Sequence, residues 1–164
     1  MSPIDPSDRS PDPSGADPNA TTTIGPVSRR IMVTVNRIVN AVVRRLGLRR
    51  FRGADLLYLT TTGRTSGQRR TTPLIYLDEG GTWAVVASNG GADWEPGWWL
   101  NLRAGTPAEV KVGDRTVAVT GAEVVGDERT ALWQTLTAEV FDYDTYQRKV
   151  SRQIAVVRLT PTTA

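Results

Sequence analysis

Six short apolar segments, each bounded by glycine-bearing or polar turns, indicate that this 164-residue chain folds mainly as β-structure. The predicted strands are residues 56–61, 72–77, 82–88, 109–112, 115–125 and 153–159. Short helices are expected from about residue 96 to 105, capped by Asp93, and from 127 to 139. A single hydrophobic core suits this length. We therefore expect an α+β fold that is mainly β: a split β-barrel of about six mostly antiparallel strands with an N-terminal amphipathic helix and two or three further short helices.

The composition divides the chain into three parts. Residues 1–27 are rich in Pro, Ser, Asp, Thr and Gly, which predicts a disordered tail. Residues 28–52 hold eight arginines and no acidic residue, and their apolar side chains fall on one helical stripe. The stripe consists of Ile31, Val35, Ile38, Val39, Val42 and Leu46. Residues 53–164, the predicted barrel, hold 11 basic and 13 acidic residues, so the net charge of +3 originates in the basic helix.

Three roles are open to the basic amphipathic helix at 28–52. Its apolar stripe can dock on the barrel, which is the simplest interpretation, or lie on an anionic membrane surface. Binding to nucleic acid is disfavoured, because the helix has few aromatic residues for stacking and the chain shows no recognition helix.

The chain contains neither histidine nor cysteine. This excludes Ser-His-Asp and Cys-His catalysis, thiolate nucleophiles, disulfides and the commonest zinc ligands, and no metal site is expected. No apolar run approaches the roughly 20 residues that cross a bilayer, and the N-terminus does not have the pattern of a signal peptide. We therefore expect a cytoplasmic protein.

The loop between the first two strands has the composition of an anion-binding site. Gly63 and Gly67 permit backbone angles that let successive N–H groups converge on one oxyanion. The surrounding hydroxyls and guanidinium groups, which suit phosphate or carboxylate, belong to Thr62, Thr65, Ser66, Arg64, Arg69 and Arg70. The alternative is an ordinary polar hairpin loop with solvated arginines.

Four ordered blocks make the chain resemble a known family. They are Thr-Thr-Gly-Arg-Thr-Ser-Gly-Gln-Arg-Arg-Thr-Thr-Pro-Leu (61–74), Val-Ala-Ser-Asn-Gly-Gly (86–91), Trp-Trp-Leu-Asn-Leu-Arg-Ala (98–104) and Asp-Tyr-Asp-Thr-Tyr-Gln (142–147). With this spacing the chain resembles the actinobacterial deazaflavin-dependent nitroreductases, which adopt a split β-barrel and use the reduced deazaflavin coenzyme F-420.

The resemblance implies a role for each matching residue. Positions that hold the coenzyme's phosphate and acidic tail match Arg64, Thr65, Ser66, Gly67 and Arg70, although many relatives carry lysine in place of Thr65. Cofactor positions around the deazaflavin ring match Pro73, Val86, Ala87, Ser88, Asn89, Trp98 and Asn101. Positions near the substrate match Ser88, Tyr143 and Tyr146, which are the predicted catalytic residues, while Val140 replaces a tyrosine that lines the substrate cavity of a characterised relative.

The activity that the resemblance implies is hydride transfer from reduced F-420 to a quinone, a nitroaromatic compound or an activated alkene. This reaction needs little acid–base machinery, which fits a histidine-free chain. The resemblance also implies peripheral attachment of the basic helix to the inner face of the cell membrane. It leaves the physiological acceptor and the oligomeric state open.

Other interpretations remain for the function and for single residues. A split barrel can instead bind flavin mononucleotide, or the chain can carry the deazaflavin at the membrane without turnover. Trp98 and Trp99 are adjacent on a predicted helix, so one of them is expected in the core. Asn101 can simply brace a loop, and Tyr143 and Tyr146 can serve in packing.

Overall fold

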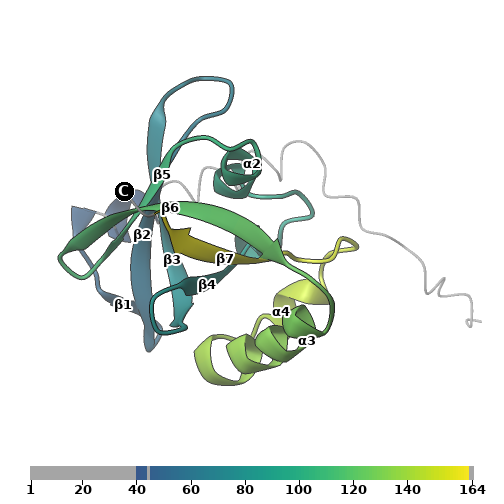
Figure 1. Ribbon diagram of the computed structural model, residues 1–164. Coiled ribbons are helices and arrows are strands. Elements are labelled where there is room, and N and C mark those ends of the chain that lie inside the picture. The colour runs from purple at the N-terminus through teal and green to yellow at the C-terminus, as the bar shows by residue number, and fades with distance from the viewer. Residues whose placement is uncertain (1–39, 44, 163–164) are drawn as a thin grey trace, which may run out of the picture.

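The computed structural model describes residues 40–43 and 45–162, and its centre is an antiparallel β-barrel (Figure 1). The strands are β1 (Arg50–Phe51), β2 (Ala54–Thr62), β3 (Arg69–Asp78), β4 (Trp83–Val86), β5 (Ala108–Val112), β6 (Arg115–Val124) and β7 (Val156–Pro161). The order β1-β2-β3-β4-β7-β6-β5 closes on itself because β2 also pairs with β5. Six antiparallel strands thus form the barrel and β1 extends it, which confirms the predicted fold class.

Short helical elements lie between the strands. They are η1 (Asn89–Gly91), α2 (Gly97–Arg103), α3 (Gly126–Thr135), a π-helical turn η2 (Leu136–Val140) that continues α3, and α4 (Asp144–Gln147). Both predicted helices are confirmed within a few residues, and α4 comes in addition. Figure 1 shows α3 and α4 together on one flank of the barrel.

The prediction that Asp93 caps α2 is wrong. The residue before the helix is Pro96, and no side chain caps this end. Asp93 lies too far from the first helical turn, and its Oδ1 instead accepts hydrogen bonds from the Ser151 backbone N–H at 3.2 Å and the Ser151 hydroxyl at 3.3 Å. The carboxylate therefore joins two loops.

Two hydrophobic clusters replace the single core expected from chain length. Strand β4 explains the division, because all four of its residues are buried and successive side chains point to opposite faces. Trp83 and Val85 belong to the cluster inside the barrel. Ala84 and Val86 belong to a second cluster with residues of α3, η2 and α4. The helices therefore cover an outer face of the sheet.

The described end of the basic segment is held against the barrel. Residues 40–43 and 45 are helical, and the helix ends before Gly47, which has a left-handed φ of 59°. The Tyr58 hydroxyl lies 3.1 Å from the backbone oxygen of Val43 and 2.7 Å from that of Leu48, so its one hydrogen is shared between these two acceptors. Arg49 Nη2 lies 3.0 and 3.2 Å from the two carboxylate oxygens of Asp114. The tail expected at 1–27 and the first part of the basic helix lie outside the described residues.

Candidate functional site

The loop between β2 and β3 is a tight hairpin connection with glycines at two of its bends, of which Gly67 has a left-handed backbone. The Gly63 N–H donates to the Gln68 carbonyl at 2.9 Å, and the Gly67 N–H donates to the Gly63 carbonyl at 2.8 Å. A Cβ on Gly63 would lie 2.5 Å from Ser66 Oγ, and Gly67 has a φ of 65°. Since these two amides bond within the loop, they are not free to converge on an anion as the sequence suggested.

Asn101 joins this loop to α2. Its side chain is buried, and its Nδ2 donates to Thr61 Oγ1 at 3.0 Å. Its Oδ1 accepts a hydrogen bond from the Arg64 backbone N–H at 3.1 Å, with Arg64 Nη1 at 3.5 Å. These contacts show the bracing role that the sequence left open. Contact between Asn101 and a cofactor ring stays a prediction.

The hairpin presents two guanidinium groups to solvent, Arg64 from the loop and Arg70 from the start of β3. Arg64 and Arg70 are exposed, and neither belongs to an ion pair found within residues 40–43 and 45–162. Arg69 differs because it pairs with Glu109 across to β5. Thr65 and Ser66 are also exposed at the tip. This set of donors fits a ligand with several negative charges, such as a phosphodiester with an acidic tail.

A second loop follows β4 and has an unusual backbone. Asn89, Gly90 and Gly91 have φ values of 49°, 66° and 79° in succession, a left-handed run that glycine favours. The Gly91 N–H donates to the Ser88 carbonyl at 2.9 Å, and Asn89 Nδ2 donates to the Trp94 carbonyl at 3.1 Å. A Cβ on Gly91 would lie 3.2 Å from Tyr146 Cδ1. The loop that carries Ser88 therefore packs directly against α4.

The two predicted catalytic tyrosines have different surroundings. Tyr143 is 4% exposed, and its ring centroid lies 5.2 Å from that of Phe141 and 6.2 Å from that of Trp133. Burial raises the pKa of Tyr143 well above its ordinary value, so its phenol stays protonated. Tyr146 is only half-buried and has Lys149 Nζ 5.6 Å from its ring centroid. Tyr146 thus has surface to offer a ligand, whereas Tyr143 serves mainly in packing.

Several predicted ring contacts are core residues. Val86 lies in the second cluster, while Ala87 and Trp98 lie in the barrel cluster with exposed fractions of 0% and 7%. Trp99 is in the barrel cluster as well, so the expected division of the two tryptophans between core and pocket is not observed. Pro73 is half-buried on β3 opposite Tyr58. The side chains of Ala87 and Trp98 leave little surface for a ligand.

Contacts in the structure bring some of the predicted residues together in two places. Asn101 holds the β2–β3 loop at Arg64, and the β4–α2 loop packs on Tyr146 of α4. Pro73 on β3 and Trp98 in the barrel core belong to neither set. No hydrogen bond or ion pair found among the described residues joins Arg64–Arg70 to Ser88, Tyr143 or Tyr146.

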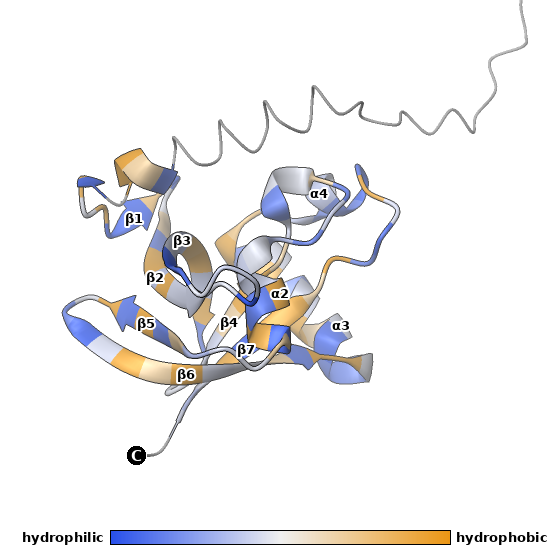
Figure 2. Cartoon of the chain, turned by 90° about the horizontal axis from the view of Figure 1, so that it is seen from above, coloured by the Kyte–Doolittle hydropathy of each residue, from blue (hydrophilic) through white to orange (hydrophobic). Residues whose placement is uncertain are grey.

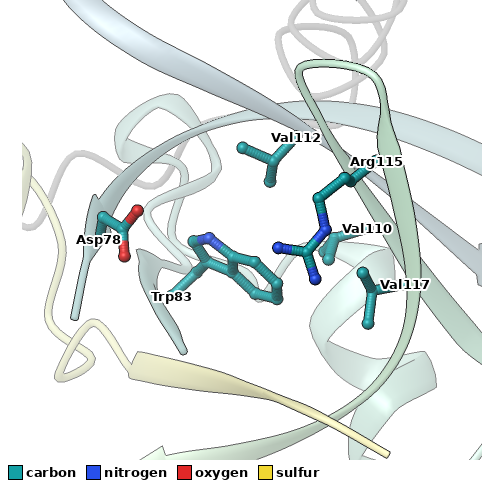
Figure 3. A pocket seen from close by; sticks show the side chains of 6 residues that line it. All are labelled: Asp78, Trp83, Val110, Val112, Arg115 and Val117. Atoms are coloured by element: carbon teal, nitrogen blue, oxygen red, sulfur yellow. The ribbon is translucent and has the colours of Figure 1, made fainter. Parts of the chain in front are cut away.

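Two cavities lie elsewhere on the barrel. One of about 110 Å³ is at a barrel end, where Figure 3 shows Trp83 between Asp78 and Arg115. The other, of about 330 Å³, lies on the outer face of β2, β3 and β5 beside Gly47 and Arg49. Neither is lined by a predicted site residue.

Sequence analysis missed Arg152. Its Nη2 lies 3.0 Å from the Ala87 carbonyl oxygen and 3.1 Å from the Ala92 carbonyl oxygen, so it holds the β4–α2 loop. The signal in the sequence is indirect. The Ser-Asn-Gly-Gly loop turns its backbone carbonyls away from neighbouring strands, so these carbonyls need a hydrogen-bond donor from another part of the chain. Nothing local identifies which distant residue supplies it.

Comparisons with known proteins agree on one family. A profile described as F420H(2)-dependent quinone reductase, where F420H(2) is reduced coenzyme F-420, matches residues 28–161. An F420H(2)-dependent quinone reductase of Mycobacterium tuberculosis strain H37Rv is 36% identical over 141 residues, which are 82% of this chain and 95% of the relative.

Two solved structures are also similar. An F420-H2 dependent reductase, FDR-A, is 35% identical with a TM-score of 0.57, over 63% of this chain and 92% of that protein. A domain-swapped dimer is 30% identical with a TM-score of 0.59, over 81% of this chain and 98% of that protein. The resemblance inferred from the four sequence blocks is confirmed.

Proposed function

This chain belongs to the F420H(2)-dependent quinone reductase family, and from that membership we propose that it is an oxidoreductase that transfers a hydride from reduced F-420 to a quinone. When bound, the deazaflavin supplies the hydride chemistry, as cofactors generally do. The observation that carries the proposal is the pair of exposed guanidinium groups on one hairpin: Arg64, whose backbone N–H is held by Asn101, and Arg70 at the start of β3.

In this proposal the β2–β3 loop binds the anionic end of the coenzyme. Arg64 and Arg70 form charge-assisted, bidentate hydrogen bonds with phosphate or carboxylate oxygens, and the Thr65 and Ser66 hydroxyls add donors. Arg69 does not compensate for the lysine that relatives carry in place of Thr65, because Glu109 already pairs with it. Affinity for the coenzyme therefore depends on Arg64 and Arg70.

In the same proposal, residues outside the β2–β3 loop orient the ring and the acceptor. Pro73, with the backbone and side chains of the β4–α2 loop at Val86–Asn89, borders the ring, and Trp98 supports it from the core. Ser88 Oγ and Tyr146 Oη donate hydrogen bonds to an acceptor oxygen and stabilise the negative charge that develops there. Tyr143, which is neutral and buried, keeps Tyr146 in place through Phe141.

The range of acceptors extends from quinones to nitroaromatic compounds and activated alkenes, because each is an electrophile that accepts hydride. Bicyclic nitroimidazoles are expected to react poorly. Val140 contributes no hydroxyl where a characterised relative has tyrosine, and it packs against the second cluster.

We also propose that the protein binds the inner face of the membrane through the segment at 28–52. Val42 and Leu46 in this segment are 50% and 66% exposed, and Arg45, Arg49 and Arg50 lie beside them in the sequence. Figure 2 shows this apolar helical turn next to β1 at the edge of the molecule. No helix of the described residues is long and apolar enough to cross a membrane, so contact would be peripheral.

The test is a fluorescence titration of purified protein with oxidised F-420. The Arg64→Ala, Arg70→Ala double variant is expected to bind about 100-fold or more weakly, because each charge-assisted bond contributes about 1.5–3 kcal/mol. Arg69→Ala and the single variant Arg64→Ala form a matched pair, since each removes one positive charge from the same hairpin but the guanidinium of Arg69 is already paired with Glu109. Equal losses in both variants, or tighter binding of flavin mononucleotide than of F-420, would refute the proposal.

A further inference from the structure

We infer that Arg152 is a positioning residue for the reductase reaction proposed above: its guanidinium group fixes the Ala87–Trp94 loop against the segment that carries Tyr146. The inference rests on the proposed function, because it concerns the geometry between Ser88 and Tyr146. It is carried by the hydrogen bonds of one half-buried side chain.

The loop turns four carbonyl oxygens toward a single nitrogen. Arg152 Nη2 lies 3.0 Å from the carbonyl oxygen of Ala87, 3.1 Å from that of Ala92, and 3.4 Å from those of Ser88 and Trp94. Two hydrogens on Nη2 serve the two shorter contacts and are shared with the longer ones. The left-handed run at Asn89–Gly91 is what brings carbonyls from both ends of the loop together.

The side chain of Arg152 is dedicated to this loop. All its side-chain hydrogen bonds found among the described residues go to loop carbonyls, and its Nε is buried without a hydrogen-bond partner. Burial lowers the pKa of Arg152, while the carboxylates of Glu95 and Asp93 raise it. The loop carbonyls and these two acids thus stabilise a guanidinium that would otherwise be costly to bury.

Further contacts make the loop and the segment after α4 one unit. Asp93 Oδ1 accepts hydrogen bonds from Ser151, as described above. Gln147 Nε2 donates to the Arg152 carbonyl at 2.8 Å, and Gln147 Oε1 accepts from the Ile154 N–H at 2.9 Å. Tyr146 packs on Gly91 at the other end of this unit. Displacing Arg152 would therefore change how Ser88 and Tyr146 face each other without removing either hydroxyl.

The test compares Arg152→Met with Arg148→Met in the full chain. Both substitutions remove one arginine from the same segment, but Arg148 is exposed, and its Nη2 donates to the Thr145 hydroxyl at 3.0 Å rather than to the loop. Three measurements are made: a titration for the dissociation constant of oxidised F-420, steady-state kinetics with menadione for kcat and KM, and hydrogen exchange of peptides that cover 87–94. Thermal unfolding reports whether each variant is folded.

For folded Arg152→Met we expect a kcat about 100-fold lower, since an ångström-scale displacement of reacting groups costs roughly that factor. The affinity for F-420 should fall by less than about tenfold, because Arg64 and Arg70 bind the anionic end independently. Exchange at Gly91 and Ala92, whose amides bond to Ser88 and Asn89, should accelerate. Arg148→Met should match the wild type in all three.

A folded Arg152→Met variant with wild-type kcat and wild-type loop protection would overturn this inference but would leave the proposed function intact. If that variant does not fold, Arg152→Lys decides: a folded lysine variant with faster loop exchange but wild-type kcat overturns the inference, and one in which kcat and loop protection fall together, or are both retained by the ammonium donor, supports it. A wild-type protein without F-420-dependent turnover would instead overturn the proposed function, and the positioning role with it.

Discussion

The buried phenol of Tyr143 makes the stability of the protein depend on pH in the alkaline range. Its pKa is raised by burial, so the unfolded chain loses this proton first as the pH rises. The stability associated with Tyr143 is therefore complete below about pH 10 and decreases above it, by about 1 kcal/mol at pH 11. We expect Tyr143→Phe to lose less stability between pH 8 and pH 11 than the wild type, as measured by urea unfolding at both values. Equal losses of stability in the variant and the wild type would contradict this prediction. A smaller loss that remains in the variant is expected from Tyr58 and Tyr76, because their pKa values are also raised.

At the level of elements, Arg158 connects three parts of the chain. From β7 its Nε and Nη2 lie 2.8 and 2.7 Å from the Glu79 carboxylate in the β3–β4 turn, and its Nη1 lies 2.7 Å from Glu128 in α3. Glu79 is 21% exposed and Glu128 is 63% exposed. We expect Glu79→Gln to destabilise the protein by about 1–3 kcal/mol and Glu128→Gln by less than about 1 kcal/mol, measured by urea unfolding at pH 7. Similar losses in both variants would contradict this difference.

The same carboxylate predicts an acid dependence. Hydrogen bonds from Arg158 hold the pKa of Glu79 below its ordinary value of 4.5. A lowered folded pKa means that this stability is present above the unfolded pKa and is lost as the pH falls through the folded one. Glu79→Gln should therefore show a smaller decrease in stability between pH 6 and pH 3 than the wild type, in urea unfolding followed by tryptophan fluorescence. If the stability of the variant and of the wild type decreases equally between pH 6 and pH 3, other carboxylates are responsible for the acid sensitivity.

The elements themselves were largely predictable, because their signals are local. The alternation of apolar and polar residues and the glycine turns predicted all six barrel strands, and only the ends of the strands differ. The strand predicted at 82–88, for example, ends at Val86 because the chain turns at Ser88. The closing pair β2–β5 joins residues about fifty positions apart, and no local pattern specifies it. The roles of Asn101 and Arg152 were the least predictable, because the hydrogen-bond partners of a buried polar side chain are determined only by the complete fold.

For the whole molecule, the exposed part of the basic segment is the surface that we propose contacts lipid. Tyr58 and Arg49 fix its end to the barrel, yet Leu46 and Phe51 remain 66% and 37% exposed among arginines. We expect the wild type to bind phosphatidylglycerol vesicles better than phosphatidylcholine vesicles in flotation, and less well in high salt. Leu46→Ser, Phe51→Ser should weaken that binding about tenfold or more, because two apolar side chains no longer enter the interface.

Val125→Ser is the matched control for this experiment, since Val125 is 68% exposed but lies between β6 and α3, away from the basic segment. It should bind vesicles like the wild type. Binding that is equal on both lipids, or that survives the double substitution, would mean that the segment does not attach the protein to a membrane. The contacts with Tyr58 and Asp114 would then indicate that the described end of the segment serves to dock on the barrel.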